Sequence, residues 1–347
     1  MKKILVILII MMVGTTGVFA QGVDIATMED SFSTFSDDVA SSLPFASTIG
    51  LNWSDATVRN FPHFGVGLTT GAVTIPSEAF TDLAESMGFA DDLPSEITDS
   101  SIGVPLPGYT LEGRIGGLFL PFDIGVKLGF IPTDIMADMP VAVDYTLAGV
   151  DIRTPILKQN LLLPSISLGV GYNYLKSGIG TSLSTGMGES IDISDAFENP
   201  QDTNVLSFTD PNARFEMESN VIDIKLQVSK TLLIFTPYVG AGYAYGWSRA
   251  GGGVLGSIQY TDDSGSTVDD LTAADIAAIE DAFAASGYDA PDLSSDGFLV
   301  SSESDGGSIR AYGGLSINLF ILKLDLNAMY NLSTQSLGAS ANVRIAF

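Results

Sequence analysis

The chain has 347 residues and no cysteine, which excludes disulfides, zinc–thiolate sites, a thiol nucleophile and an N-terminal lipid-anchoring cysteine. Its 15 lysines and arginines stand against 41 acidic residues, so nucleic acid is not expected as a partner. Only 16% of the residues are charged and the mean hydropathy is +0.31, a combination unusual for a soluble acidic protein. We infer that the acids are concentrated in parts of the chain.

The N-terminus reads as a secretory signal peptide over residues 1–20. Lys2 and Lys3 precede a short apolar run at 4–13, and residues 18–20 (VFA) offer small side chains at the usual cleavage positions. The mature chain is therefore expected to start at Gln21, exported beyond the inner membrane. The alternative, an N-terminal membrane anchor, is disfavoured because the apolar run is too short to span a bilayer.

Residues 21–60 form a segment ahead of the strands. Residues 24–42 are acidic and weakly helical in pattern, whereas residues 45–53 alternate like a strand but break the parity of the strands that follow. Two interpretations stay open. The segment is a plug inside the lumen of a barrel, or it supplies an extra strand and raises the strand count to twelve.

Period-two alternation of apolar and small or polar residues then recurs ten times. The expected strands cover 61–71, 108–119, 122–131, 140–153, 164–175, 213–229, 232–247, 307–319, 321–332 and 335–347. Each has roughly the length that crosses a bilayer at a tilt. A change of phase near Gly149 predicts a β-bulge there.

The connections alternate between short and long. Short turns are expected at 120–121, 230–231 and near Phe320, a medium one at 154–163, and long loops at 72–108, 177–212 and 249–307. Helices are expected at 77–88 and at 272–286 inside two of the long loops. This pattern predicts an all-β, transmembrane, antiparallel up-and-down barrel over 61–347, with short periplasmic turns and long acidic outer loops.

Aromatic residues fall into two groups at opposite ends of the expected strands, which is typical of girdles at membrane interfaces. The periplasmic group is Phe64, Phe119, Phe122, Phe235 and Phe347; the outer group is Tyr109, Phe130, Tyr172, Tyr174, Tyr243, Tyr245, Trp247 and Tyr330.

Charged residues of both signs occupy the other face of the strands, and pairing would offset the cost of holding them at membrane depth. The predicted lumen-lining charges are Glu112, Arg114, Lys127, Asp144, Asp151, Arg153, Asp223, Lys225, Arg310, Lys323, Asp325 and Arg344, with Asp123 beside them.

One stretch matches a calcium-binding loop. Asp292, Ser294, Asp296 and Glu303 stand at positions 1, 3, 5 and 12 of the pattern, with Gly297 at position 6. The competing interpretation is a solvated acidic loop, because no helix is expected on either side. No other cofactor is expected. His63 is the single histidine and lacks a nucleophile motif, so the chain is not expected to be an enzyme.

Together these features resemble the integral outer-membrane β-barrel proteins of diderm bacteria, porin-like in character, over residues 61–347. The resemblance implies that the last strand carries the signal read by the barrel assembly machinery, here Leu337, Val343, Ile345 and Phe347. The segment ahead of the barrel is similar in general character to the plug of the FadL-like long-chain fatty acid transporters, although none of the specific motifs of that family is present. The barrel is similar in general character to OmpW proteins.

Two function classes stay open. The first is a channel or transporter for small solutes, with hydrophobic solutes among the candidates, and the sequence does not reveal which solute it carries. The second is a surface-exposed adhesin or interaction protein that binds its partner through the acidic outer loops, either directly or with calcium bound to them. Both are consistent with outer-membrane lipid as the surrounding partner.

Overall fold

The computed structural model describes residues 25–58, 61–86, 103–117, 121–130, 142–182, 190–192, 205–261, 267–269, 272–273, 276–277, 280–281, 292–294 and 297–347. Among these residues no helix is long and apolar enough to cross a membrane.

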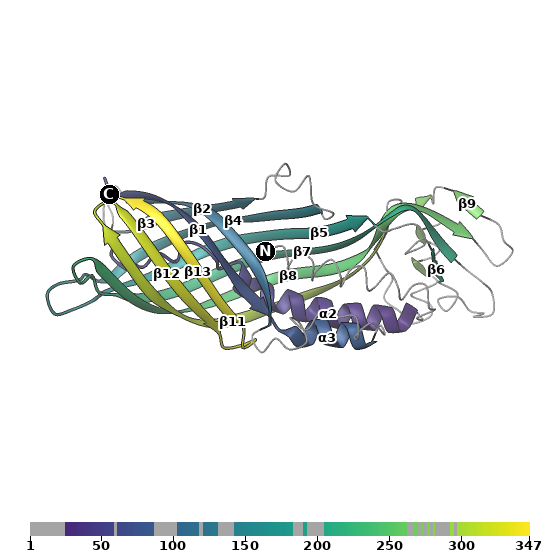
Figure 1. Ribbon diagram of the computed structural model, residues 1–347, viewed down its shortest axis with the longest axis horizontal. Helices are drawn as coiled ribbons and strands as arrows, with labels where there is room; N and C mark the ends of the chain where they lie inside the picture. Colours follow the sequence, from purple (N-terminus) through teal and green to yellow (C-terminus); the bar gives the residue numbers. More distant parts are fainter. Residues whose placement is uncertain are drawn as a thin grey trace.

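Ten strands of the described chain close into an antiparallel barrel (Figure 1). They are β1 (Phe64–Ile75), β2 (Val104–Gly116), β3 (Asp123–Phe130), β4 (Ala142–Leu157), β5 (Ser165–Ser182), β7 (Val205–Ser229), β8 (Phe235–Thr261), β11 (Gly297–Leu319), β12 (Leu322–Asn331) and β13 (Leu337–Ala346). The predicted barrel of about ten strands is confirmed, and the alternative of twelve strands in the ring is wrong.

The first and last strands complete the ring. β1 pairs with β13 from Gly65 opposite Ala346 to Val73 opposite Gly338. Beyond the strand the Phe347 amide donates to the Phe64 carbonyl at 2.9 Å. Closure leaves neither strand with an unpaired edge, which satisfies the backbone where no water is present.

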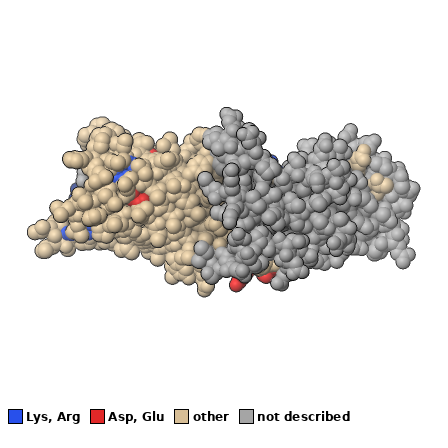
Figure 2. All heavy atoms as spheres, in the orientation of Figure 1, with Lys and Arg blue, Asp and Glu red and all other residues tan. Residues whose placement is uncertain are grey.

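The alternation of side chains gives the barrel two different surfaces. Exposed apolar residues cover the outside, one from each strand being Val66, Leu111, Val126, Ile152, Val170, Ile224, Val239, Ile309, Leu326 and Val343. Polar side chains are buried inside. One from each strand, in chain order, is Thr69, Glu112, Lys127, Asp151, Ser167, Lys225, Thr236, Arg310, Asp325 and Arg344. The face in Figure 2 is accordingly almost free of charged atoms over the described barrel.

The two ends of the barrel differ. At one end the strands join by short turns, such as the one between β11 and β12, and we call it the short-turn end. At the other, the long-loop end, β7, β8 and β11 extend far beyond the ring, to the right in Figure 1. The three-residue strands β6 (Ser190–Asp192), β9 (Thr267–Asp269) and β10 (Asp292–Ser294) pair with these extensions.

The aromatic residues lie near both ends. Phe64, Phe235 and Phe347 are exposed at the short-turn end, and Phe130, Tyr172, Tyr243, Trp247 and Tyr330 toward the long-loop end. Tyr109 is half-buried, and its ring stacks on the buried ring of Tyr145 with centroids 5.2 Å apart. Phe119 lies outside the described residues.

The predicted bulge near Gly149 is wrong. β4 pairs with β5 in continuous register from Ala142 to Thr154, and the register shifts only between Pro155 and Leu157. Odd-numbered residues of β4, such as the buried Asp151, therefore face the lumen over most of the strand. Tyr145 and Leu147, which would face outward if Asp144 faced the lumen, are instead buried inside the barrel.

Two helices lie at the long-loop end. α2 (Ile25–Ala46) contacts β7, β8 and β11, and α3 (Ser77–Ser86) packs against it (Figure 1). Both correspond to predicted helices, although α2 ends four residues later than expected, at Ala46 instead of at residue 42. Most of the helix expected at 272–286 lies outside the described residues. Among the few described positions of this range, Ala273, Ile276 and Glu280 are helical.

Candidate functional site in the barrel lumen

The inside of the barrel holds a stretch of the N-terminal region. Residues 47–58, which we call the lumen segment, follow α2 without regular secondary structure and are almost entirely buried. The stretch begins at α2 and leads toward β1, which starts at the short-turn end. The segment thus passes along the lumen from one end of the barrel to the other. It forms no strand, so the period-two pattern at 45–53 has another cause.

The barrel wall holds the lumen segment by its main chain. Side chains of β3 and β7 donate to successive carbonyls: Lys127 Nζ to Ser47 and Ile49 (2.6 Å each), Lys225 Nζ to Leu51 (3.0 Å), and Gln227 Nε2 to Trp53 (2.7 Å) and Ser54 (3.0 Å). These bonds satisfy carbonyls that no helix or strand would satisfy. They also place two ammonium groups against neutral oxygens.

Gly50 allows the segment to approach the wall closely. Its φ is +87°, and a Cβ there would lie 2.6 Å from Thr110 Oγ1 and 2.7 Å from Glu112 Oε1. Glycine adopts this left-handed conformation without a steric penalty. A larger residue would displace both the segment and the side chains of β2.

Trp53 anchors the middle of the segment. It is 1% exposed, and its indole Nε1 donates to Glu112 Oε2 at 2.6 Å. The guanidinium carbons of Arg344 and Arg114 lie 4.6 and 5.5 Å from its ring centroid. Cation–π attraction to two guanidinium groups therefore helps to fix the ring, and the burial of the indole adds a large apolar contact to a polar lumen.

Asp55 is the one charged residue among residues 47–58. Its carboxylate pairs with Lys323 Nζ at 3.0 Å and Arg344 Nη1 at 3.2 Å, and its main-chain carbonyl accepts from Arg153 Nη1 at 2.9 Å. Asp55 and Lys323 remain 13% and 16% exposed, so this cluster touches solvent near the short-turn end. Cations from two strands, β12 and β13, thus meet on the single carboxylate of the segment, and a cation of β4 binds the main chain beside it.

The wall is linked by ion pairs of its own. Asp123 lies between Arg114 (2.5 Å) and Arg153 (2.8 Å), and Asp151 between Arg114 and Lys225 (2.8 Å each). Two further pairs join Arg310 to Asp223 (2.9 Å) and Arg344 to Asp325 (2.7 Å). Each pair is nearly fully buried, so neither partner can lose the other without leaving an uncompensated charge.

Of the predicted lumen-lining charges, eleven lie inside the barrel: Glu112, Arg114, Lys127, Asp151, Arg153, Asp223, Lys225, Arg310, Lys323, Asp325 and Arg344. Asp144 does not, and its prediction is wrong. Because β4 has no bulge at Gly149, the Asp144 side chain faces outward, is 58% exposed and pairs with Arg214.

Sequence reasoning did not identify the residues of the lumen segment as a site. Trp53 and Asp55 carry its strongest side-chain contacts, and Gln227 joins two of its carbonyls to the wall. The available signal was slight. Trp53 and Asp55 are the only tryptophan and the only acid in residues 47–58. The bonds to main-chain carbonyls cannot be predicted from residue type, because every residue has a carbonyl.

Little space is left beside the segment. A cavity of about 10 Å³ is lined by Gly50, Asn52, Trp53, Thr69, Asp325, Asn327, Ser340 and Asn342. Within the described residues the side-chain oxygens of Asn52, Asn327 and Asn342 have no hydrogen-bond partner. A polar space of this size suits a single water molecule.

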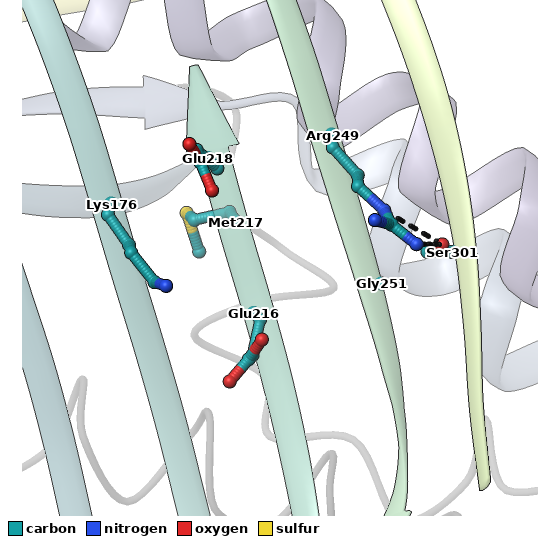
Figure 3. Close-up of a pocket in the computed structure, with 7 residues that line it drawn as sticks. All are labelled: Lys176, Glu216, Met217, Glu218, Arg249, Gly251 and Ser301. Atoms are coloured by element: carbon teal, nitrogen blue, oxygen red, sulfur yellow. Dashed lines mark hydrogen bonds between the residues drawn. The ribbon is translucent and has the colours of Figure 1, made fainter. Parts of the chain in front are cut away.

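A second pocket opens at the long-loop end, on the outward side of β5, β7, β8 and β11 (Figure 3). It measures about 130 Å³ and is lined by Lys176, Glu216, Met217, Glu218, Arg249, Gly251 and Ser301. Strand register places Lys176 opposite Glu218, Glu218 opposite Arg249, and Arg249 opposite Glu303. This row of alternating charge lies one step beyond the aromatic residues Tyr174 and Trp247.

The residues of the calcium prediction lie near the tip of a hairpin. Asp292 pairs with Leu299 and Ser294 with Gly297 in β10 and β11, and Glu303 lies further along β11 opposite Arg249. Asp296 lies outside the described residues. Such a hairpin differs from the loop between two helices that the pattern usually occupies. Calcium binding stays a prediction.

The remaining predicted residues lie at the short-turn end and on the outside. Leu337, Val343, Ile345 and Phe347 are exposed on the outer surface of β13 and just beyond it. The His63 ring nitrogen Nδ1 is hydrogen-bonded to a Phe347 main-chain oxygen. This contact ties the histidine to the closure of the ring.

A closed ring of strands with an apolar exterior and an ion-paired interior defines an integral outer-membrane-type β-barrel protein. The model of a family of unknown function (DUF6588) matches residues 111–347, and the chain belongs to that family. No curated protein matches the chain.

Solved structures with some similarity are themselves membrane barrels. The translocator domain of the autotransporter NalP from Neisseria meningitidis is 10% identical, with 91% of this chain and 99% of that chain covered and a TM-score of 0.35. The outer-membrane protease OmpT from Escherichia coli is 10% identical over 82% and 97%, with a TM-score of 0.31. A Pseudomonas aeruginosa FadL homologue is 8% identical over 91% and 97%, with a TM-score of 0.26. Scores this low carry no argument about function.

Proposed function

We propose that the protein is an outer-membrane channel for small solutes, closed by the lumen segment. The observation that carries this proposal is how the segment is held. Its carbonyls and one carboxylate bind polar side chains of the wall, and a water molecule or a solute could replace each of these contacts. A plug held in this way can exchange its polar contacts for water when it shifts, and the buried side chains of Ile49, Leu51 and Trp53 set the cost of that movement.

The arrangement also argues against a barrel that serves only as a membrane anchor. Ten strands enclose a lumen that wall side chains can nearly fill. Here glycines of three strands instead lie against the N-terminal region: Gly65 of β1 against Trp53, Gly108 of β2 against Ile49 and Gly246 of β8 against Pro44. The wall is thus shaped to leave room for a separate piece of chain. The charges inside would line an aqueous path if that piece moved.

Conductance in planar bilayers tests the proposal. Refolded protein is expected to show brief, rare openings, and Asp55→Asn to raise the open probability because the bonds to Lys323 and Arg344 lose their charge. Asp223→Asn is the matched control, since it removes a buried acid that pairs only within the wall, with Arg310. It should not alter the open probability.

Silence of both the unmodified protein and Asp55→Asn, in samples shown to be folded, would contradict the channel. The second candidate, a surface interaction protein, would then take its place. The mixed-charge pocket of Figure 3 favours that candidate to some degree, because it faces outward near the long loops. Binding of a partner by a silent barrel would be its signature.

Three further parts of the proposal concern biogenesis and surroundings. Residues 1–20 act as a cleaved signal peptide, the outward residues of β13 with Phe347 are read by the barrel assembly machinery, and membrane lipid surrounds the apolar band. N-terminal sequencing of the purified protein, with Gln21 as the expected first residue, tests the first part.

A further inference from the structure

We propose that Lys323 and Arg344 form a carboxylate-binding site for anionic solutes, which Asp55 occupies in the closed state. The inference rests on the proposed channel function and deepens it. It names carboxylate-bearing small molecules as the solute class. Asp55 is then a built-in substitute for the solute.

The first support is the local geometry. The two oxygens of the Asp55 carboxylate go to different cations, Oδ2 to Lys323 Nζ at 3.0 Å and Oδ1 to Arg344 Nη1 at 3.2 Å. A planar group with two acceptor oxygens matches this spacing, as carboxylates do in charge-assisted pairs.

The second support lies in the wall itself. Lys323 and Arg344 stand directly opposite each other in the β12–β13 pair, and both point into the lumen. Like charges at facing positions of an antiparallel pair are destabilising. Asp325 compensates only Arg344, at 2.7 Å. The wall therefore needs an anion between Lys323 and Arg344, and any shift of the lumen segment would leave that need open to an anion from solution.

The third support is the charge balance of the lumen. The inner face of the ten strands carries seven cationic side chains and five carboxylates among the described residues. They are Arg114, Lys127, Arg153, Lys225, Arg310, Lys323 and Arg344 against Glu112, Asp123, Asp151, Asp223 and Asp325. An open lumen would thus carry an excess of positive charge that favours anions. The partial exposure of Lys323 gives them access from the short-turn end.

Chemical rescue tests the site without requiring conductance. Asp55→Ala removes the substitute carboxylate, and formate should restore the urea midpoint of unfolding of the refolded barrel, whereas chloride at equal ionic strength should not. At about ten times its Kd, formate would shift the folding equilibrium about elevenfold. The rescue should vanish in the double variant Asp55→Ala, Lys323→Met. It should also be absent in the control variant Asp223→Ala, which removes a carboxylate of the wall instead of the lumen segment.

Equal effects of formate and chloride, or a rescue that survives Lys323→Met, would overturn the site. If Asp55→Ala does not refold in chloride, its yield on refolding in formate becomes the readout, and a yield no higher in formate overturns the proposal equally. In bilayers, Asp55→Ala channels should prefer anions and formate should reduce the chloride current. Rescue by formate without conductance in any variant would refute the channel and leave the anion site in place.

Discussion

At the scale of single residues, the inside of this barrel is organised by shared charges. Asp123 accepts from two arginines, Arg114 from β2 and Arg153 from β4, and it is fully buried. Asp144, nine residues before Arg153 on the same strand, makes a pair at the surface. The two acids differ in what their removal leaves behind. Removing the Asp123 carboxylate leaves two buried cations, Arg114 and Arg153, each without one of its ion-pair partners. Removing the Asp144 carboxylate leaves Arg214, which is partly exposed to solvent.

Asp123→Asn should therefore lower the free energy of unfolding by about 3–5 kcal/mol, the range for breaking a buried ion pair. Asp144→Asn, the control, should change it by no more than about 0.5 kcal/mol, as at other surface positions. Urea unfolding of the refolded barrel, followed by intrinsic fluorescence, measures both. Similar losses for the two variants would refute the buried network as a source of stability.

At the scale of elements, the strands were predictable, a plug from residues 21–60 was one of two open interpretations, and the contacts that hold residues 47–58 in the lumen were not predictable. A strand with one face in lipid and one in a polar interior must alternate, so the ten runs could be located from residue type alone. Asp144 was misplaced because the small residues around Gly149 were interpreted as a change of phase. The lumen segment binds through its carbonyls, which every residue carries, so only Trp53 and Asp55 distinguish it.

The contact between α2 and α3 should depend on pH. Burial, followed by the carboxylates of Asp82, Asp37 and Glu78, raises the pKa of Asp38 above its ordinary value. An acid whose pKa is higher in the docked than in the undocked state favours docking at low pH. That contribution is lost as the pH rises from the ordinary value through the raised one. The helices should therefore pack more tightly near pH 4 than near pH 7.

Hydrogen exchange of residues 77–86, corrected for the intrinsic pH dependence, measures this effect. Asp38→Asn should remove most of the difference between the two pH values, while the distant Asp144→Asn should leave it unchanged. An exchange rate that is independent of pH in the unmodified protein would contradict the prediction.

The hairpin of β10 and β11 carries the calcium prediction. Calorimetric titration should detect binding at millimolar calcium, and Glu303→Ala should abolish it, because the distal glutamate supplies two oxygens in such loops. Glu216→Ala, an acid of the neighbouring pocket, serves as control. The absence of heat at millimolar calcium in the unmodified protein would exclude the site.

At the scale of the whole molecule, closure of the ring depends on its last strand. The Phe347 ring lies 5.0 Å from that of Phe64, and the amide of Phe347 donates to the Phe64 carbonyl. Phe347→Ala should greatly reduce the amount of folded protein in the outer membrane, seen as the heat-modifiable band on gels. Phe320→Ala removes a still more exposed aromatic at the same end and should have little effect. Equal amounts for both variants would contradict the assembly signal.

The path of the lumen segment restricts how such a channel could open. One end continues from α2, packed among β8, β11 and α3 at the long-loop end, and the other leads to β1 at the short-turn end. A chain fixed at both mouths of a tube cannot be withdrawn from it. Opening would have to be a sideways displacement that keeps about twelve residues of backbone inside the tube, or the passage of a helix about 10–12 Å wide through the whole length of the barrel. The first movement leaves a narrow, crescent-shaped path along one wall, which sets a low upper limit on the size of any solute.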